Sequence, residues 1–299
     1  MWLFWTACTE TPLPDKPATV TPSPWIAESF TSPLPTGSLP DVAAAVKTAF
    51  ERARTVHASP VHAAYDAAMV GASSVCPAEY SSDYGNFWYD QCTSDLGTEF
   101  NGYVFAYDAI DEFDPYSGLF LTYWTMYGAA TVVAGDGNVL DVSGSSQWVV
   151  GTADDLIIWS DFVAGAFNWD GVESVGTWMD AGLDPDLYLY ALLVPSVGAK
   201  YLYLDGGIGD GAEAVSFTAM EVGNALVGAT CDVEPAGAMA VRTADGSWYD
   251  VLFDGSFDPY APTAVADCDG CGRAFFEGVA IGDVCVDITP LLDWTEAPW

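Results

Sequence analysis

Acidic side chains gather in two Gly- and Asp-rich stretches of the sequence, and this arrangement predicts a weak calcium site. The candidate ligands are Asp205, Asp210, Glu213, Asp267 and Asp269. Carboxylate oxygens are hard ligands of the kind that Ca²⁺ prefers. Their spacing does not match that of an EF-hand, and solvated aspartates of ordinary turns give the same pattern. Both interpretations therefore stay open from the sequence, and no other cofactor is predicted.

Several tryptophans lie within two positions of an aspartate, a combination that suits sugar binding or glycoside hydrolysis. The pairs are Trp159–Asp161, Trp169–Asp170, Trp178–Asp180 and Asp293–Trp294. Aromatic faces can stack on sugars, and a glycosidase needs two positioned carboxyl groups of which one is kept in an apolar pocket. In a chain with 12 tryptophans most of them are expected in the core. The sequence therefore assigns no catalytic residue.

Nucleophilic catalysis has little support in the sequence, because the chain contains only two histidines, His57 and His62. A Ser–His–Asp triad would have to use one of them, and both lie at a predicted helix junction. We interpret them as surface or helix-end histidines. The sequence has no GxSxG, no HExxH, no P-loop and no GxGxxG in a strand–turn–helix context. These absences favour a non-enzymatic protein.

Seven cysteines are present, and setting Cys8 aside leaves an even number that predicts three disulfides. The six are Cys76, Cys92, Cys231, Cys268, Cys271 and Cys285. An even set of this kind is typical of an exported protein. Cys76 and Cys92 are close in sequence and isolated from the others, which predicts a local pair. The last four can pair in three ways, and a zinc site built on Cys268-x-x-Cys271 is the alternative, although a second CxxC is missing.

The charge balance excludes several classes of partner. The chain has 42 acidic and 7 basic residues, a net charge of −35, and four of the basic residues precede residue 55. Nucleic acids and anionic lipid surfaces both require a basic face, so neither is expected as a direct partner. Mutual repulsion among the carboxylates is tolerable where salt or divalent cations screen it. This predicts a salty environment, with simple solubility as the alternative.

The first residues, Met-Trp-Leu-Phe-Trp-Thr-Ala-Cys, resemble the end of a bacterial lipoprotein signal peptide. That resemblance implies that residues 1–8 are a signal-peptide remnant and that Cys8 carries the lipid anchor. Residues 9–40 are rich in Pro and Thr, which favours an extended, semi-rigid tether. The whole layout is similar to that of bacterial cell-surface lipoproteins. It implies an extracytoplasmic location in the cell envelope, with membrane contact only through the lipid.

Two helices are predicted before the β region. The first covers 41–57 with Asp41 as its cap, because apolar residues recur there at helical spacing. The second covers 60–70 with Ser59 as its N-cap and a proline in its first turn. We expect 41–71 to form a short helical hairpin.

The rest of the chain, 72–299, is predicted to be a disulfide-braced antiparallel β domain, with a division into two sub-units near residue 200 left open. Segments rich in Val, Tyr, Trp, Phe and Thr alternate with Gly-containing turns. The predicted hairpins join 130–134 to 138–142, 187–194 to 200–204, and 238–243 to 247–253. Connections this short force antiparallel pairing. The predicted fold class is mainly β, an antiparallel β-sandwich or open barrel with a short N-terminal helical hairpin.

One uncharged stretch, 115–135, is long enough to span a bilayer. It contains several Thr, Tyr and Gly residues, and no Lys or Arg flanks it to set an orientation. Two buried strands are the favoured interpretation, and a transmembrane helix is the alternative.

The combined observations predict a non-enzymatic, envelope-anchored acidic β domain for surface binding or adhesion, with a carbohydrate or a protein as its ligand. The alternative is a secreted glycan-acting hydrolase that uses a carboxylate pair. A cleft with two carboxyl groups about 5–9.5 Å apart would favour the hydrolase. A flat strip of aromatic side chains would favour the binding protein.

Overall fold

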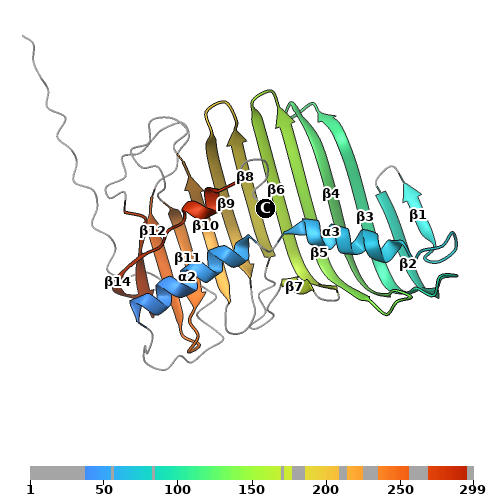
Figure 1. Ribbon diagram of the computed structural model, residues 1–299, viewed down its shortest axis with the longest axis horizontal. Helices are drawn as coiled ribbons and strands as arrows, with labels where there is room; N and C mark the ends of the chain where they lie inside the picture. The colour runs from blue at the N-terminus through green and yellow to red at the C-terminus, as the bar shows by residue number, and fades with distance from the viewer. Residues whose placement is uncertain are drawn as a thin grey trace, which may run out of the picture.

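The computed structural model describes residues 38–54, 57–82, 85–169, 172–176, 186–208, 214–224, 235–255 and 269–294 of the chain (Figure 1). Cys8 and nearly all of the predicted tether lie outside these ranges, as do Cys231 and Cys268. The predictions made for those residues, lipidation included, stay predictions.

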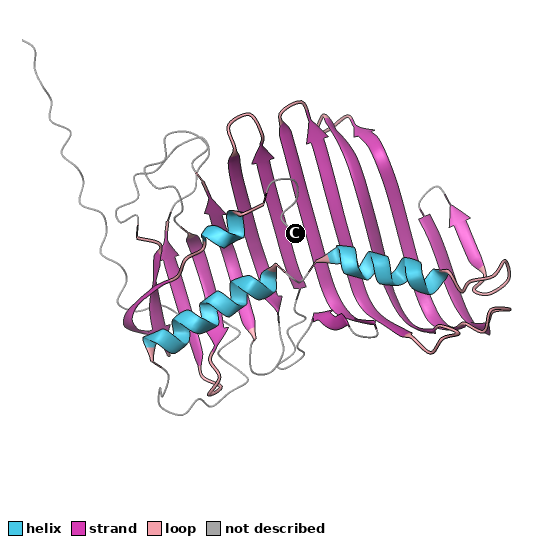
Figure 2. Ribbon diagram, in the orientation of Figure 1, coloured by secondary structure: helices cyan, strands magenta, loops and turns pink. Residues whose placement is uncertain are grey.

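Antiparallel strands make up most of the described chain and form one continuous sheet of fourteen strands (Figure 2). They are β1 (Glu79–Ser82), β2 (Gly85–Thr93), β3 (Glu99–Asp114), β4 (Leu119–Val133), β5 (Val139–Ala153), β6 (Leu156–Trp169), β7 (Val172–Gly176), β8 (Asp186–Val194), β9 (Ala199–Ile208), β10 (Val215–Gly223), β11 (Ala236–Arg242), β12 (Trp248–Asp254), β13 (Cys271–Phe276) and β14 (Val279–Cys285). They follow chain order from β1 to β14, except that β7 pairs with β6 off this path and β8 is the next neighbour of β6. The predicted fold class, mainly β and antiparallel with two short helices near the N-terminus, is confirmed. A single sheet corresponds to the open form of that prediction.

The three predicted hairpins are all present, as β4–β5, β8–β9 and β11–β12. Polar side chains in their turns satisfy the backbone locally. In the β11–β12 turn, Asp245 Oδ1 accepts hydrogen bonds from the Ser247 amide (3.0 Å) and from the Thr243 hydroxyl (2.6 Å). Aspartate favours turns for this reason, since its short side chain reaches the backbone two residues on. The pairing register of the two strands follows from this local geometry.

The uncharged stretch 115–135 forms one strand, not the two that were predicted. Residues 115–118 make a turn, and β4 then runs for 15 residues between β3 and β5. Trp124 and Met126 are buried on one face of β4, whereas Tyr127 is half-exposed on the other. This alternation is that of a sheet with one covered face. Within the described ranges, no helix is both long and apolar enough to span a membrane.

The helices begin earlier than the sequence pattern predicts. The first, α2 (Leu39–Ala53), starts after Ser38, whose amide and hydroxyl both donate to Asp41 Oδ2 at 2.8 Å. Asp41 therefore closes a capping box from the third helical position and is not itself the N-cap. The second, α3 (Ala58–Met69), starts after His57, so that Pro60 is its third residue. Proline is tolerated there because amides of the first helical turn have no helical acceptor.

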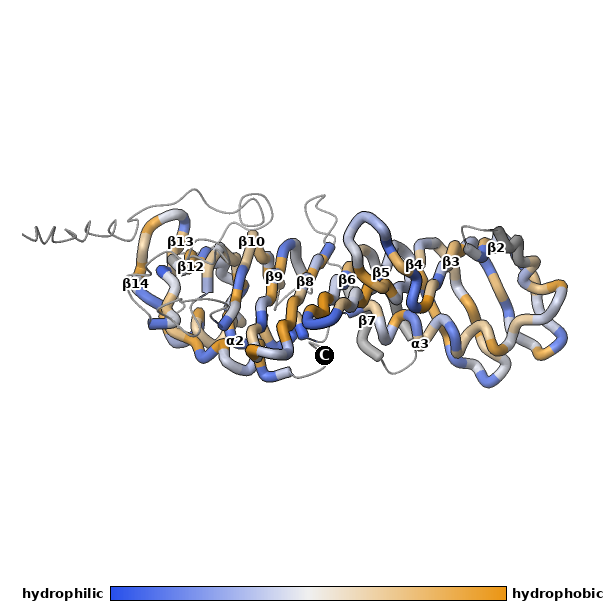
Figure 3. Tube along the Cα trace, turned by 90° about the horizontal axis from the view of Figure 1, so that it is seen from above, coloured by the Kyte–Doolittle hydropathy of each residue, from blue (hydrophilic) through white to orange (hydrophobic). Residues whose placement is uncertain are grey.

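The two helices lie end to end across one face of the sheet and do not fold back on each other as a hairpin (Figures 1 and 3). Each packs on a different part of the sheet: α2 contacts β11 and β14, and α3 contacts β4, β5 and β6. Phe50 of α2 stacks on Phe217 with ring centroids 6.1 Å apart. We call this covered face the inner face, and the opposite one the outer face.

The outer face differs between the two ends of the sheet. In β2–β9, buried inner-face residues alternate with outer-face residues that are wholly or partly exposed. In β10–β13 one row of outer-face residues is buried as well: Ser216, Ala240, Asp250 and Phe275 are directly paired neighbours across these strands and are at most 9% exposed. Other outer-face positions of these strands, such as Thr218, Glu221 and Leu252, are exposed or partly exposed. The sheet is therefore one-sided in its N-terminal half and partly covered on its outer face, as well as on its inner face, in its C-terminal half.

The long central strands β5 and β6 bend at a pair of glycines that lie directly opposite each other. Gly144 and Gly165 face each other on β5 and β6, with φ of +148° and +110°. A Cβ atom on either one would lie 2.0 Å from a backbone oxygen of the other strand. Only glycine fits this close approach, and such glycine pairs curve a sheet. Figure 1 shows this curvature in the long strands β3–β5.

Candidate functional site

The outer face of β2–β4 carries a cluster of seven tyrosines and phenylalanines. This first aromatic cluster consists of Phe87, Tyr89, Tyr103, Phe105, Tyr107, Tyr123 and Tyr127. Because residues two apart on a strand point to the same face, the alternation of aromatic and apolar residues in the sequence places all seven opposite the helices. Tyr89 is 72% exposed and Tyr127 is 48% exposed. The cluster is therefore a surface that a ligand can reach.

Cross-strand contacts order the rings of the first cluster. Phe87, Phe105 and Tyr127 are directly paired in one row across the three strands. Phe105 and Tyr127 stack with centroids 4.9 Å apart and planes 22° apart. Tyr107 and Tyr123 are tilted at 5.4 Å. Pairs of this kind hold each ring in place, so that the aromatic surface is preformed.

A second aromatic cluster lies on the outer face of β8 and β9. It consists of Tyr188, Tyr190, Tyr201 and Tyr203. Tyr188 and Tyr203 meet edge to face at 6.1 Å, and Tyr190 and Tyr201 do so at 6.3 Å. Between the two clusters, β5 and β6 present mostly smaller residues such as Ser145 and Ser160. Three strand spacings separate β4 from β8, or about 15 Å.

A carboxylate accompanies each cluster. The Tyr123 hydroxyl is hydrogen-bonded to Tyr107 and Glu112, and burial first and these neighbours second raise its pKa. The Tyr201 hydroxyl is hydrogen-bonded to Glu221 of β10, and burial together with the charge of Glu221 raises the pKa of Tyr201. Burial also raises the pKa of Glu221, although the hydrogen bond from Tyr201 opposes this shift. Each cluster thus combines aromatic faces with a negatively charged acceptor.

A cleft of about 570 Å³ lies on the inner side, between α3 and strands β2–β4. Its polar lining residues are His62, Tyr65, Asp66, Asn86 and Asp108. The His62 ring stacks on Trp124 at 4.5 Å, and its Nε2 atom lies 3.2 Å from Asp66. These contacts fix α3 on the sheet. No serine or cysteine is among the described residues that line this cleft, so no nucleophilic triad is assembled there.

Asp161 occupies a buried position at the start of α3. Both of its carboxylate oxygens accept hydrogen bonds from the Ala58 amide, at 2.9 and 3.1 Å. Burial raises the pKa of Asp161 to about 7, against the smaller opposing effect of the hydrogen bond. The neighbouring His57 has its pKa lowered by burial. Asp161 therefore anchors the helix by its N-terminal amide and does not open onto the cleft.

The predicted tryptophan–aspartate pairs do not form sugar platforms where they are described. Trp159 and Trp294 pack edge to face at 5.3 Å, and both are at least 92% buried. Lys200 lies over the Trp294 ring at 5.3 Å and donates to the Leu292 carbonyl oxygen at 2.7 Å. This pins the 3₁₀ helix η2 (Thr289–Leu292) to the sheet. The pairs Trp169–Asp170 and Trp178–Asp180 have side chains outside the described residues.

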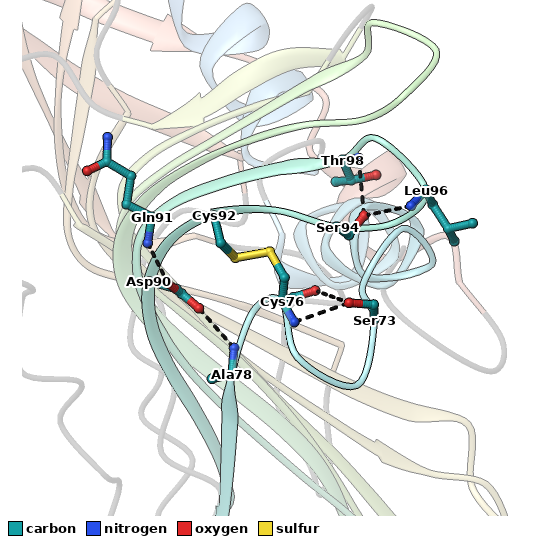
Figure 4. Close-up of a disulfide and its surroundings, with 9 residues drawn as sticks. All are labelled: Ser73, Cys76, Ala78, Asp90, Gln91, Cys92, Ser94, Leu96 and Thr98. Atoms are coloured by element: carbon teal, nitrogen blue, oxygen red, sulfur yellow. Dashed lines mark hydrogen bonds between the residues drawn. A yellow bond between two sulfur atoms is a disulfide. The ribbon is translucent and has the colours of Figure 1, made fainter.

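Two of the predicted disulfides are present. Cys76 is bonded to Cys92, as the local spacing predicts, and this bond ties the segment before β1 to β2 (Figure 4). Beside it, Asp90 Oδ2 accepts from the Ala78 amide at 3.1 Å. Cys271 is bonded to Cys285, because the β13–β14 hairpin places the two directly opposite each other. This bond excludes a zinc site that uses both residues as thiolates.

The candidate calcium ligands are not brought together where they are described. Asp205 lies on β9, and its Oδ1 accepts from the Ala219 amide at the β10 bulge (2.8 Å). Asp269 precedes β13 and accepts from the Cys271 amide (2.9 Å). Three strands separate β9 from β13, and no group of metal-ligating side chains occurs among the described residues. Asp210, Glu213 and Asp267 lie outside the described residues.

The sequence interpretation missed the most accessible feature, the outer-face aromatic clusters. It considered aromatic residues only next to acids in the sequence. Reading β3 at a period of two would have found Tyr103, Phe105 and Tyr107 on one face, opposite the buried Phe100 and Val104. The pairing of His62 with Asp66 also has a sequence signal, since residues four apart meet on a helix.

Comparisons with known proteins add no assignment. No protein-family model matches the sequence, and neither the curated proteins nor the solved structures contain a significant match. The functional argument therefore stands on the chemistry of the described residues.

Proposed function

We propose that this protein is a non-enzymatic binding protein that holds a carbohydrate chain on the outer face of β2–β9. The observation that carries the proposal is the pair of exposed aromatic clusters on the one-sided half of the sheet. Tyrosine and phenylalanine rings offer flat apolar faces for sugar rings, and the hydroxyl of Tyr adds a polar contact. A row of preformed rings loses little conformational entropy when it binds a ligand.

The location of the protein is part of the proposal. Disulfides persist outside the cytosol, which fits the bonds at Cys76–Cys92 and Cys271–Cys285. We further propose that Cys8 is lipidated and that 9–40 tethers the domain to a bacterial envelope. In this arrangement the anchor leaves the sheet exposed to glycans or other ligands at the cell surface, so that the protein acts in adhesion.

The alternative, a glycan hydrolase, has a less suitable site. Asp66 and Asp108 both line the cleft under α3, but both carboxyl groups are exposed to water. The general acid of a glycosidase sits in an apolar pocket. Asp161 does lie in such surroundings, but its oxygens accept from the Ala58 amide.

A glycan-binding assay tests the proposal. The full chain is titrated with soluble neutral and amino-sugar oligosaccharides by calorimetry, beside the double variant Tyr89→Ala/Tyr103→Ala. These two tyrosines are directly paired on β2 and β3. Removing both is expected to weaken binding about tenfold, since each ring contact contributes roughly 0.5–1.5 kcal/mol.

The matched control is Tyr116→Ala, because Tyr116 is 98% exposed in the β3–β4 turn and outside both clusters. It is expected to leave binding unchanged. An absence of binding to every oligosaccharide, or equal losses in the cluster and control variants, would overturn the proposal. Release of new reducing ends during the titration would instead support the hydrolase.

A further inference from the structure

The outer face of β2–β9 lacks basic side chains. The sequence has no lysine or arginine between Arg54 and Lys200, a stretch that includes all of β1–β8. Lys200 itself is paired with the buried inner-face residue Leu193, and it points to Trp294 on the inner side. Within the described residues, the surface that carries both aromatic clusters therefore offers no cation to its carboxylates.

Carboxylates lie among the aromatic rings at both ends of this surface. Glu112 is next to Tyr123 in the first cluster, and Glu221 is next to Tyr201 and Tyr203 in the second. Glu221 is partly buried, so that water neutralises its charge less well than at an exposed position. A positively charged ligand group would gain attraction from these carboxylates and from the faces of the rings. A neutral ligand would gain only the stacking, and an acidic one would be repelled.

We infer that the glycan held by the outer face is an amine-bearing one, a polymer of amino sugars whose nitrogens are not acetylated. This inference rests on the proposed function and adds the chemical class of its ligand. The two clusters lie about 15 Å apart across the sheet, and their carboxylates, Glu112 on β3 and Glu221 on β10, are six strand spacings apart, or about 29 Å. A chain that crosses the strands can therefore place protonated amines at Glu112 and at Glu221 and sugar rings on the tyrosines between them.

The experiment compares two oligosaccharides that differ only at nitrogen. Glucosamine oligomers and N-acetylglucosamine oligomers of the same length are titrated into the full chain at a pH where the amines are protonated. The amine form is expected to bind roughly tenfold more tightly at low salt, as hydrogen bonds to charged groups are stronger than neutral ones. The difference should shrink when NaCl screens the charges.

Single substitutions identify the carboxylates that cause the preference for the amine oligomer. Glu221→Gln and Glu112→Gln are each expected to weaken binding of the amine oligomer and to leave the acetylated oligomer unchanged. Glu51→Gln is the matched control, because Glu51 is an exposed glutamate on α2 at the inner side, 3.8 Å from Lys47. It removes the same charge and is expected to have no effect. Equal losses in all three variants would mean unspecific attraction to an acidic protein and would overturn the inference.

The outcomes separate this inference from the proposed function. Equal affinity for both oligomers would overturn the inference, while the sugar-binding function would stand. Binding of neither would overturn both. An oligolysine peptide of matched charge serves as a third ligand. If it binds more tightly than the glucosamine oligomer, and if Tyr89→Ala/Tyr103→Ala does not weaken the sugar, the surface recognises a basic protein instead of a glycan.

Discussion

The N-terminal and C-terminal halves of the sheet differ in how much of the outer face is buried. In the N-terminal half, α3 covers the inner face of β4–β6, and the outer face of β2–β9 keeps rings such as Tyr89 and Tyr127 exposed. In the C-terminal half, α2 covers the inner face, and one row of the outer face is buried too, down to 0% exposure at Phe275. A sheet needs only one covered face to be stable. Part of the outer face of the C-terminal half is therefore a second core that adds stability, whereas the outer face of the N-terminal half stays accessible to a ligand.

The chemistry of the two outer faces agrees with this division. Trp248 and Phe275 fill the outer side of the C-terminal half, where they are 1% and 0% exposed. The N-terminal half uses tyrosine at comparable positions, and a phenol has both an apolar ring and a group that bonds to water. Large exposed apolar patches normally mark interaction sites. The same alternation of residues along a strand can therefore build a buried core in one half of the sheet and an accessible surface in the other.

A pair of outer-face substitutions tests the comparison most strongly. Phe275→Ala removes a fully buried ring and is expected to lower the free energy of unfolding by about 3–5 kcal/mol. Phe105→Ala removes a partly exposed ring on the same face of the sheet, and about 1 kcal/mol is expected. Urea denaturation of both variants gives the two values. Equal losses would mean that the outer face of the N-terminal half is covered after all.

The buried carboxyl group of Asp161, which accepts from the first amide of α3, predicts that the free energy of unfolding depends on pH. Asp161 has a pKa of about 7 in the folded chain and 3.8 as its ordinary value. The folded state thus binds the proton more tightly, so the stability from this group is fully present below about pH 4 and is lost as the pH rises through 7. A shift of about three units corresponds to about 4 kcal/mol.

Asp161→Asn is expected to remove this dependence, with unfolding free energies near those of the wild type at pH 4 and higher at pH 8. The Asn carbonyl can still accept from the Ala58 amide. The control is Asp154→Asn, an exposed residue in the β5–β6 turn that changes the net charge equally. Denaturation at several pH values measures both variants. An unchanged pH profile in Asp161→Asn would show that Asp161 is not the titrating anchor of α3.

The two disulfides test the two ends of the sheet, because Cys76–Cys92 lies beside β1 and β2 and Cys271–Cys285 joins β13 to β14. Cys76–Cys92 and Cys271–Cys285 have sequence separations of 16 and 14. Loops this similar predict nearly equal losses of about 3 kcal/mol when each pair is replaced by alanine. Thermal unfolding of the two double variants compares them. A much larger loss for one pair would mean that its half depends on the cross-link beyond the loop-closure entropy.

Local signals in the sequence predict much of the fold. The turn residues of the three hairpins fix which strands are neighbours, because a short connection allows only antiparallel pairing. The spacing of Cys76 and Cys92 likewise predicts their bond. The sequence did not predict that 115–135 is one strand, because a long uncharged run does not say where a turn falls. It also did not predict that the two helices pack end to end on the sheet, because that arrangement depends on which strands each helix contacts in the folded chain.

The sequence alone determined the acidic character, the alternation along the strands, the hairpins and one disulfide, because each of these depends on residues close together in the chain. Only the tertiary structure decided that the strands form one sheet, that Cys271 pairs with Cys285, and that Tyr89 and Tyr127 face outward while Phe275 is buried. An alternating pattern defines two faces but not which of them is covered. Which face is covered depends on where distant segments such as the helices pack, and this packing decides which residues form the core and which form the binding surface.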